Sequence, residues 1–135
     1  MIAVDTNLLV YAHREDSPFH EPAFACIDSL ASGRASWAIP WPCLHEFYAI
    51  ATHPRIYSPP TPLVQALEQI DAWLESPTLV LLSESGEHWP LLRTLIESSR
   101  IAALCLRHGV RELWSADRDF SRFPQLFVTN PLVGK

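Results

Sequence analysis

Residues 113–120 read LWSADRDF, an apolar strand end that gives way to two carboxylates, Asp117 and Asp119. Residues 1–5, MIAVD, have the same design, because a short apolar strand ends there in Asp5. In a parallel sheet the carboxyl ends of the strands lie at one edge, where ligands bind. Two strands that deliver acids to that edge predict a site for a hard metal ion, an arrangement that can cut phosphodiesters.

Short apolar stretches alternate with helical patterns along the chain. We expect strands at residues 2–4, 35–39, 78–82 and 112–115, with 126–128 as a fifth. Helical patterns lie between them, at residues 8–11, 20–30, 42–53, 62–76, 83–97 and 101–108. This alternation predicts an α/β fold, namely a three-layer α/β/α domain with a central parallel sheet of four to five strands. The length of 135 residues suits a single domain over residues 1–135.

Residue types also predict local features of the helices. We expect Thr6 and Asn7 to cap the first helix, and Thr61 to cap the fourth, with Pro62 at its first position. Helical spacing predicts an apolar face in the fourth helix formed by Leu63, Leu67, Ile70 and Leu74. The corresponding face of the third helix is expected to consist of Leu44, Phe47, Tyr48 and Ala51.

The charge balance is acidic, with a formal net charge of −5 and Lys135 as the single lysine. A broad, non-specific nucleic-acid binder needs a basic surface, so that class is excluded. An enzyme that acts on nucleic acid at a small metal site is not excluded, because bound cations reverse the local sign of the potential. Cys26, Cys43 and Cys105 are few and far apart. They are expected to be small buried residues in a reducing compartment rather than a zinc site.

No apolar run approaches the length needed to span a membrane, and the N-terminus lacks the pattern of a secretory signal. We therefore expect a soluble, cytoplasmic protein.

Each acid also has a simpler interpretation. Asp5 is placed to be the N-cap of the first helix, and Glu46 to be a solvated glutamate on the surface of the third. Asp117 and Asp119 are equally compatible with an exposed turn. The hydroxyl of Ser115 beside the acids, and the shared edge of the sheet, favour a site for Mg²⁺ or Mn²⁺.

The motifs, taken in order along the chain, resemble those of a known family. They are VDTN at residues 4–7, Glu46 on a helix, IAAL at 101–104 and LWSADRDF at 113–120. This combination is similar to the PIN-domain ribonucleases and, within them, to the VapC toxins of bacterial VapBC toxin–antitoxin pairs. The resemblance spans nearly the whole chain and extends to TNPL at residues 129–132.

The resemblance implies an endoribonuclease toxin that depends on Mg²⁺ or Mn²⁺ and cuts tRNA, rRNA or mRNA. It also implies a homodimer and a cognate VapB-type antitoxin whose tail blocks the active site. By position, it assigns the metal ligands as Asp5, Glu46 and Asp117, a further catalytic acid as Asp119, and supporting polar residues as Ser115 and Asn7.

One part of the family pattern is missing. Members of the family place another aspartate just before the run that corresponds to IAAL, whereas this chain has Ser98, Ser99 and Arg100 there. A serine cannot supply the negative charge, Arg100 would repel a cation, and Glu97 faces another side of the helix. The connection into residue 101 is also shorter than in the family.

Three explanations are open for this departure. The sequence omits a loop that carries the acid, the gene has lost that loop, or the protein is a natural inactive variant. We favour the first, which predicts a Cα–Cα step between residues 97 and 102 well above the usual distance of about 3.8 Å.

Two other classes of function compete with the nuclease. The missing acid favours a PIN-like binding module that keeps its antitoxin and dimer surfaces without turnover. A metal-dependent phosphohydrolase for a small substrate would also have aspartates at strand ends, but the chain has no D-x-D-x-T nucleophile motif.

Overall fold

The computed structural model describes residues 1–84, 105, 108–110, 112–115 and 127–132. Its strands are β1 (Ile2–Val4), β2 (Trp37–Pro40), β3 (Leu79–Leu82), β4 (Glu112–Trp114) and β5 (Phe127–Thr129). Its helices are α1 (Thr6–His13), α2 (His20–Ser32), α3 (Trp41–Ala51) and α4 (Leu63–Leu74). The helices expected at residues 83–97 and 101–108 lie outside the described residues, except for Cys105, which is helical, and residues 108–110.

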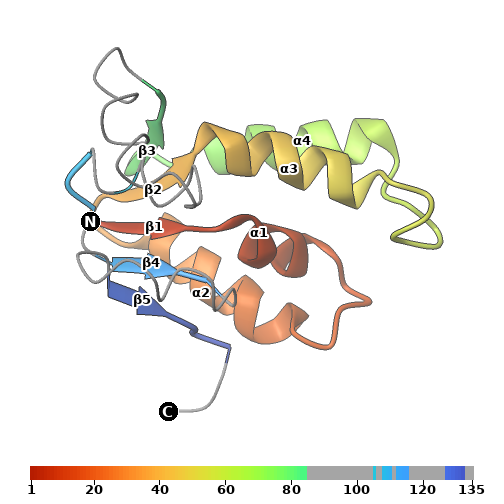
Figure 1. The fold of residues 1–135 in the computed structure, drawn as a ribbon, viewed down its shortest axis with the longest axis horizontal. Coiled ribbons are helices and arrows are strands. Elements are labelled where there is room, and N and C mark those ends of the chain that lie inside the picture. Colours follow the sequence, from red (N-terminus) through yellow and green to blue (C-terminus); the bar gives the residue numbers. More distant parts are fainter. Residues whose placement is uncertain (85–104, 106–107, 111, 116–126, 133–135) are drawn as a thin grey trace, which may run out of the picture.

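The five strands form one parallel sheet in the order β3-β2-β1-β4-β5 (Figure 1). The prediction of a parallel sheet in an α/β fold is therefore confirmed, and the fifth strand is present. The chain moves from β1 through β2 to β3 and then returns past β1 to β4. The strand order thus reverses between β1 and β4, and ligands bind at such a switch point in open α/β sheets.

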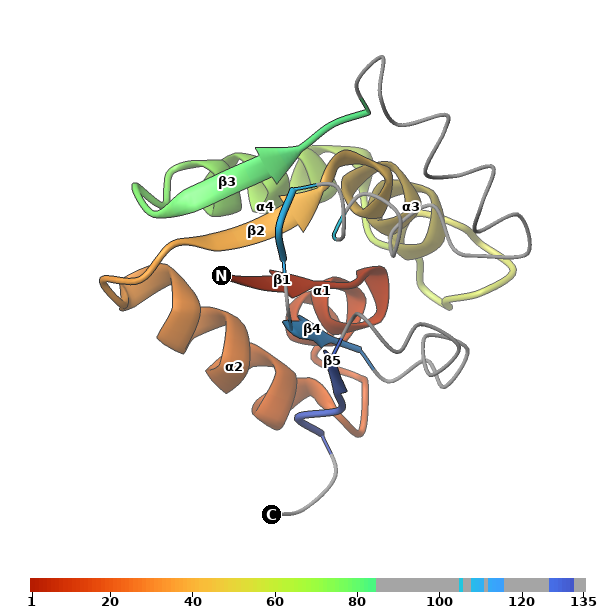
Figure 2. The same ribbon diagram turned by 60° about the vertical axis from the view of Figure 1, so that its left-hand side comes forward.

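The helices α1 to α4 connect strands that advance in one direction across the sheet. Because such crossovers are right-handed, these connections lie on one face. Figure 2 shows α3 and α4 beside β2 and β3, and α2 on the side of β1, β4 and β5. The largest fully buried side chains come from both sheet and helices: Trp37, Phe47, Leu8, Leu9, Ile39, Leu44, Leu82, Leu113, Val4 and Val110.

The buried face of α4 differs from the predicted one. Leu63, Leu67 and Leu74 are 53%, 49% and 39% exposed, whereas Ala66 and Trp73 are buried. The ring of Trp73 packs edge-on against Phe47 of α3 with 4.8 Å between centroids. Burial of the large indole and of the small Ala66 therefore sets the rotation of α4, and the three leucines face outward. Ile70, the fourth member of the predicted face, is half-buried and packs against the core as expected.

Three further local predictions need correction. The N-cap of α1 is Asp5, and Thr6 and Asn7 lie within the first turn. Pro62 occupies the N-cap position of α4 without a side-chain hydrogen bond, so Thr61 does not cap that helix. Tyr48 is 40% exposed and does not share the buried face of α3.

Glycines lie at the ends of two helical segments, where a glycine is expected to stop a helix. Gly33 is the C-cap residue of α2. Gly109 has φ of 73°, a left-handed conformation that glycine adopts without strain. The N–H of Val110 donates to the carbonyl of Cys105 at 2.8 Å, which closes the helix end. Within the described segments, no helix combines the length and the apolar character that crossing a membrane requires.

Candidate functional site

Asp5 lies at the carboxyl end of β1, at the point where the strand order reverses. Its backbone N–H donates to the carbonyl of Trp114 at 3.2 Å, which continues the pairing of β1 with β4. The next residue begins α1, and Oδ1 of Asp5 accepts from the backbone N–H of Thr6 at 2.8 Å. Asp5 is only 4% exposed. The helix-capping interpretation is thus correct. Capping by itself does not exclude a ligand role, because it uses only one of the two lone pairs on one carboxylate oxygen.

Ser115 occupies the equivalent position after β4. Its hydroxyl donates to Oδ2 of Asp5 at 2.7 Å, and its backbone N–H donates to the carbonyl of Thr129 at 2.8 Å. The side chain is 1% exposed. The structure therefore places Ser115 and Asp5 side by side at the carboxyl edge of the sheet.

Glu46 reaches the same place from α3. Its Oε2 accepts a hydrogen bond of 2.7 Å from the hydroxyl of Thr6. Glu46 is exposed, as the surface interpretation expects, but its carboxylate is tied to the residue beside Asp5. Thr6 is itself 3% exposed and hydrogen-bonds both acids, Asp5 through its backbone N–H and Glu46 through its hydroxyl.

Two buried thiols lie near Asp5. The Sγ–H of Cys43 donates to Oδ1 of Asp5 at 3.7 Å. Burial, followed by the negative charge of Asp5, raises the pKa of the Cys43 thiol well above its ordinary value. The same two causes raise the pKa of Cys105 to about 12. Both thiols are therefore neutral at physiological pH. The prediction of small buried cysteines is confirmed for these two, whereas Cys26 is only half-buried.

The remaining predicted site residues are not brought into this arrangement by the described part of the chain. Asn7 is half-buried in the first turn of α1. Asp117 and Asp119 lie outside the described residues. Residues 97–102 lie outside them too, so the expected long Cα–Cα step in that segment stays a prediction. Within the described ranges, no three His, Cys, Asp or Glu side chains are grouped closely enough to hold a metal ion.

Sequence reasoning missed Thr6 and Cys43 as members of this site. A signal for Thr6 was its hydroxyl directly after Asp5. Cys43 precedes Glu46 by three positions, a spacing that places both side chains on one side of a helix. Neither signal was specific, because a threonine in a first turn and a cysteine in an apolar helix are both common in ordinary structural roles.

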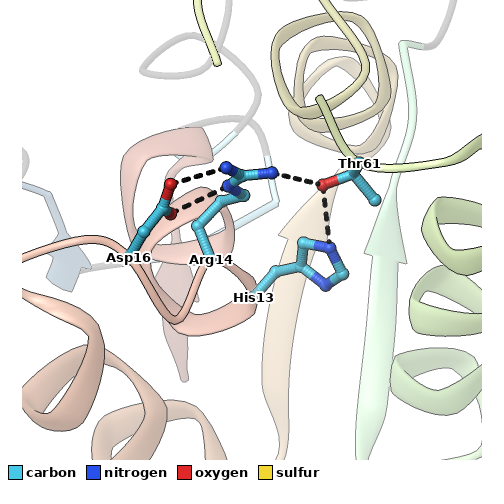
Figure 3. Close-up of polar contacts among 4 residues, drawn as sticks. All are labelled: His13, Arg14, Asp16 and Thr61. Atoms are coloured by element: carbon cyan, nitrogen blue, oxygen red, sulfur yellow. Dashed lines mark hydrogen bonds and ion pairs between the residues drawn. The ribbon is translucent and has the colours of Figure 1, made fainter. Parts of the chain in front are cut away.

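A second polar cluster ties the end of α1 to the segment before α4 (Figure 3). The hydroxyl of Thr61 hydrogen-bonds Nε2 of His13 at 3.2 Å and accepts from Nη1 of Arg14 at 3.3 Å. Arg14 also forms a two-point ion pair with Asp16, at 2.6 and 2.9 Å, and this pairing lowers the pKa of Asp16. The Arg14 guanidinium lies 4.3 Å from the ring centroid of Tyr57. Thr61 thus joins a network between elements, which explains its burial without a capping role.

This cluster lines an open pocket of about 570 Å³. The pocket is about 10 Å from Thr6 along α1, since His13 is seven positions after Thr6 and each position adds about 1.5 Å. It contains no acid of the predicted site.

Comparison with known proteins places this arrangement in a family. The PIN domain family matches residues 2–126, nearly the whole chain. The chain belongs to the PIN domain family. Ribonuclease VapC43 of Mycobacterium tuberculosis is 32% identical over 145 residues, which cover 100% of this PIN domain and 98% of the relative. Ribonuclease VapC48 of the same organism is 27% identical over 140 residues, covering 96% of this chain and 97% of the relative.

Solved structures agree with the fold of this PIN domain. VapBC2 from Rickettsia felis, crystallised bound to a DNA fragment from its promoter, has a TM-score of 0.66 at 21% identity. The match covers 96% of this chain and 98% of that one. VapC20 of Mycobacterium tuberculosis, described as a sarcin–ricin loop cleaving toxin, has a TM-score of 0.65 at 17% identity over 90% and 94% of the two chains. At these identities the likeness establishes the PIN fold alone.

Proposed function

We propose that this PIN domain is a metal-dependent endoribonuclease, the toxin of a VapBC-type toxin–antitoxin pair. The observation that carries the proposal is the link from buried Asp5 through Thr6 to Glu46 at the switch point of the sheet. VapC43 and VapC48, which match this chain along nearly their whole length, are named as ribonucleases, and this supports the same reaction class.

The residues present fit a hard divalent cation. Asp5 and Glu46 offer carboxylate oxygens, the ligand type that Mg²⁺ and Mn²⁺ prefer, and Asp117 is the third acid that we propose as a ligand. When bound, such a cation polarises the scissile phosphate and lowers the pKa of a coordinated water. Asp119 is proposed as an accessory acid, with Ser115 and Asn7 as supporting polar residues.

Asp5 and Glu46 have different roles in the proposed reaction. Asp5 accepts hydrogen bonds from Thr6, Ser115 and Cys43, so its carboxylate is held in one orientation before any ligand arrives. Such preorganisation saves the cost of ordering the group during the reaction. Glu46 is exposed and uses Oε2 toward Thr6, which leaves Oε1 able to orient an attacking water.

We propose RNA as the substrate, with tRNA, rRNA and mRNA as the candidate classes. A VapB-type antitoxin is the proposed protein partner, and a homodimer the proposed state of the toxin, acting in the cytoplasm. The solved structure of VapBC2 from Rickettsia felis, bound to promoter DNA, supports the proposal of a protein partner.

A second candidate, a binding module without turnover, rests on Ser98, Ser99 and Arg100 in place of the expected acid. The alignment with VapC43 spans 145 positions against 135 residues in this chain, so ten positions of that relative have no counterpart here. A module of this kind would bind its antitoxin and leave RNA intact.

The deciding experiment measures cleavage of total RNA with added Mg²⁺ or Mn²⁺. Asp5→Asn and Asp117→Asn test the acids, and Glu68→Gln, an exposed acid on α4, is the matched control. We expect each aspartate substitution to lower the rate by more than about 100-fold, above the loss typical of residues that only support metal ligands. The control should cleave like the parent.

Two results would decide against the nuclease. Cleavage that survives both aspartate substitutions contradicts the carboxylate site. An inactive parent chain that still co-purifies with a VapB-type antitoxin supports the binding module instead.

A further inference from the structure

Two hydrogen bonds cross between the start of α1 and the first half of α3. The hydroxyl of Thr6 donates to Glu46 at 2.7 Å, and the thiol of Cys43 donates to Asp5 at 3.7 Å. Asp5 and Thr6 are consecutive, and Cys43 and Glu46 are three positions apart on one side of α3. Each element therefore supplies one acid and the donor for the acid of the other element.

Glu46 and the two donors differ in how firmly they are held. Thr6 and Cys43 are 3% and 0% exposed, so the core fixes both donors. The glutamate side chain is exposed and long, and such a side chain loses rotamer freedom only when a partner holds it. The hydroxyl of Thr6 is the one partner that the described residues provide for Glu46.

We propose that Thr6 and Cys43 are positioning residues that set the placement of Glu46 relative to Asp5. The consequence for a cation rests on the proposed function, because a divalent ion held by both acids needs their oxygens at a set separation. Hydrogen-bond partners of metal ligands commonly change metal affinity by about 10- to 100-fold when they are removed.

A purely structural role of Thr6 and a positioning role predict different rankings of the Thr6 variants. Thr6→Val keeps the shape of the side chain and loses the hydroxyl, whereas Thr6→Ser keeps the hydroxyl and loses a methyl group. If Thr6 serves only to fill the core, Thr6→Ser should be the more harmful change. If it positions Glu46, Thr6→Val should lower Mn²⁺ affinity by about tenfold and Thr6→Ser should retain it. Cys43→Ala and Cys43→Ser form the equivalent pair for the second donor.

The test combines two measurements on the full chain. Calorimetric titration with Mn²⁺ gives the affinity of the parent and the four variants. Urea unfolding in a chelator, without metal, gives two double-mutant cycles, one pairing Thr6→Val with Glu46→Ala and the other Cys43→Ala with Asp5→Ala, since alanine at each acid removes the acceptor. Positioning predicts non-additive effects in both cycles, and affinity that follows the presence of the donor group.

The outcomes separate this inference from the proposed function. A parent that binds no Mn²⁺ refutes the metal site, while the unfolding cycles still decide the positioning. Additive cycles overturn the positioning even if the parent cleaves RNA. Equal Mn²⁺ affinity of Thr6→Val and Thr6→Ser also overturns it. If a valine or alanine variant fails to fold, Mn²⁺ titration of the serine variants and of Glu46→Ala replaces the cycles. Loss of Mn²⁺ affinity in Thr6→Ser would then contradict the positioning role.

Discussion

The hydroxyl of Ser115 donates a 2.7 Å hydrogen bond to Oδ2 of Asp5, although 110 positions separate the two residues. The register of the sheet explains the contact. Val4 pairs with Trp114 across β1 and β4, so the residues that follow the two strands meet at the carboxyl edge. A slip of one position would turn Ser115 to the other face of the sheet.

Ser115→Ala removes a donor from a buried carboxylate. Hydrogen bonds to charged groups contribute about 1.5–3 kcal/mol, so we expect the free energy of unfolding to fall by about that amount. Urea unfolding monitored by circular dichroism measures the change. Ser29→Ala is the matched control, because its hydroxyl bonds a helix carbonyl on the exposed side of α2. An equal effect of the two substitutions would contradict the special role of the Ser115 hydroxyl.

Thr61→Val tests the cluster at the end of α1. The hydroxyl of Thr61 is a partner of both His13 and Arg14, and the residue is 4% exposed. Its loss removes one partner from each of these half-buried side chains, and we expect destabilisation by about 0.5–1.5 kcal/mol in thermal or urea unfolding. Thr52→Val, at a hydroxyl that bonds a carbonyl of α3 on the exposed side, should change stability by less than about 0.5 kcal/mol. Wild-type stability of Thr61→Val would show that the network is dispensable.

Trp73→Ala tests which face of α4 packs on the core. Trp73 is 6% exposed and contacts Phe47, so its truncation should cost about 3–5 kcal/mol. Leu67→Ala is the control on the outward face, where the leucine is 49% exposed, and it should cost less than about 0.5 kcal/mol in the monomer. The reverse order of these two costs in urea unfolding would restore the leucine face predicted from helical spacing.

The buried thiol of Cys105 makes stability depend on pH in the alkaline range. Its pKa is raised from the ordinary value of 9.0 to about 12 in the folded protein. Between these values the unfolded chain loses the thiol proton and the folded chain keeps it, so stability is complete below pH 9 and falls as pH rises toward 12. The slope for one such thiol is up to about 1.4 kcal/mol per pH unit.

Urea unfolding from pH 8 to 10.5 checks this dependence. Cys105→Ala should lower stability at every pH, because it leaves a cavity, and should also flatten the decline above pH 9. Cys26→Ala, at a half-buried thiol, is the control and should leave the decline unchanged. If the fall of the unfolding free energy with pH is unchanged in Cys105→Ala, this thiol does not cause it.

The sheet and the acids at its edge followed from local sequence. Apolar runs of three to five residues that end in polar groups predict buried parallel strands, and an acid directly after such a run must lie at the carboxyl edge. For this reason Asp5 could be assigned to the carboxyl edge of the sheet from the sequence, whereas its hydrogen bond with Ser115 could not. The stop at Gly109 was equally local, since its φ of 73° suits glycine.

Tertiary packing decided the features that depend on more than one element. Helical spacing alone favoured the leucine stripe of α4, but contact with Phe47 gave Trp73 the buried position. The links from Thr6 to Glu46 and from Cys43 to Asp5 also depend on how α1 and α3 approach one another. Periodicity in a sequence reports which residues can share a face. Which face is buried, and which donor meets which acid, depends on packing between segments distant in the chain.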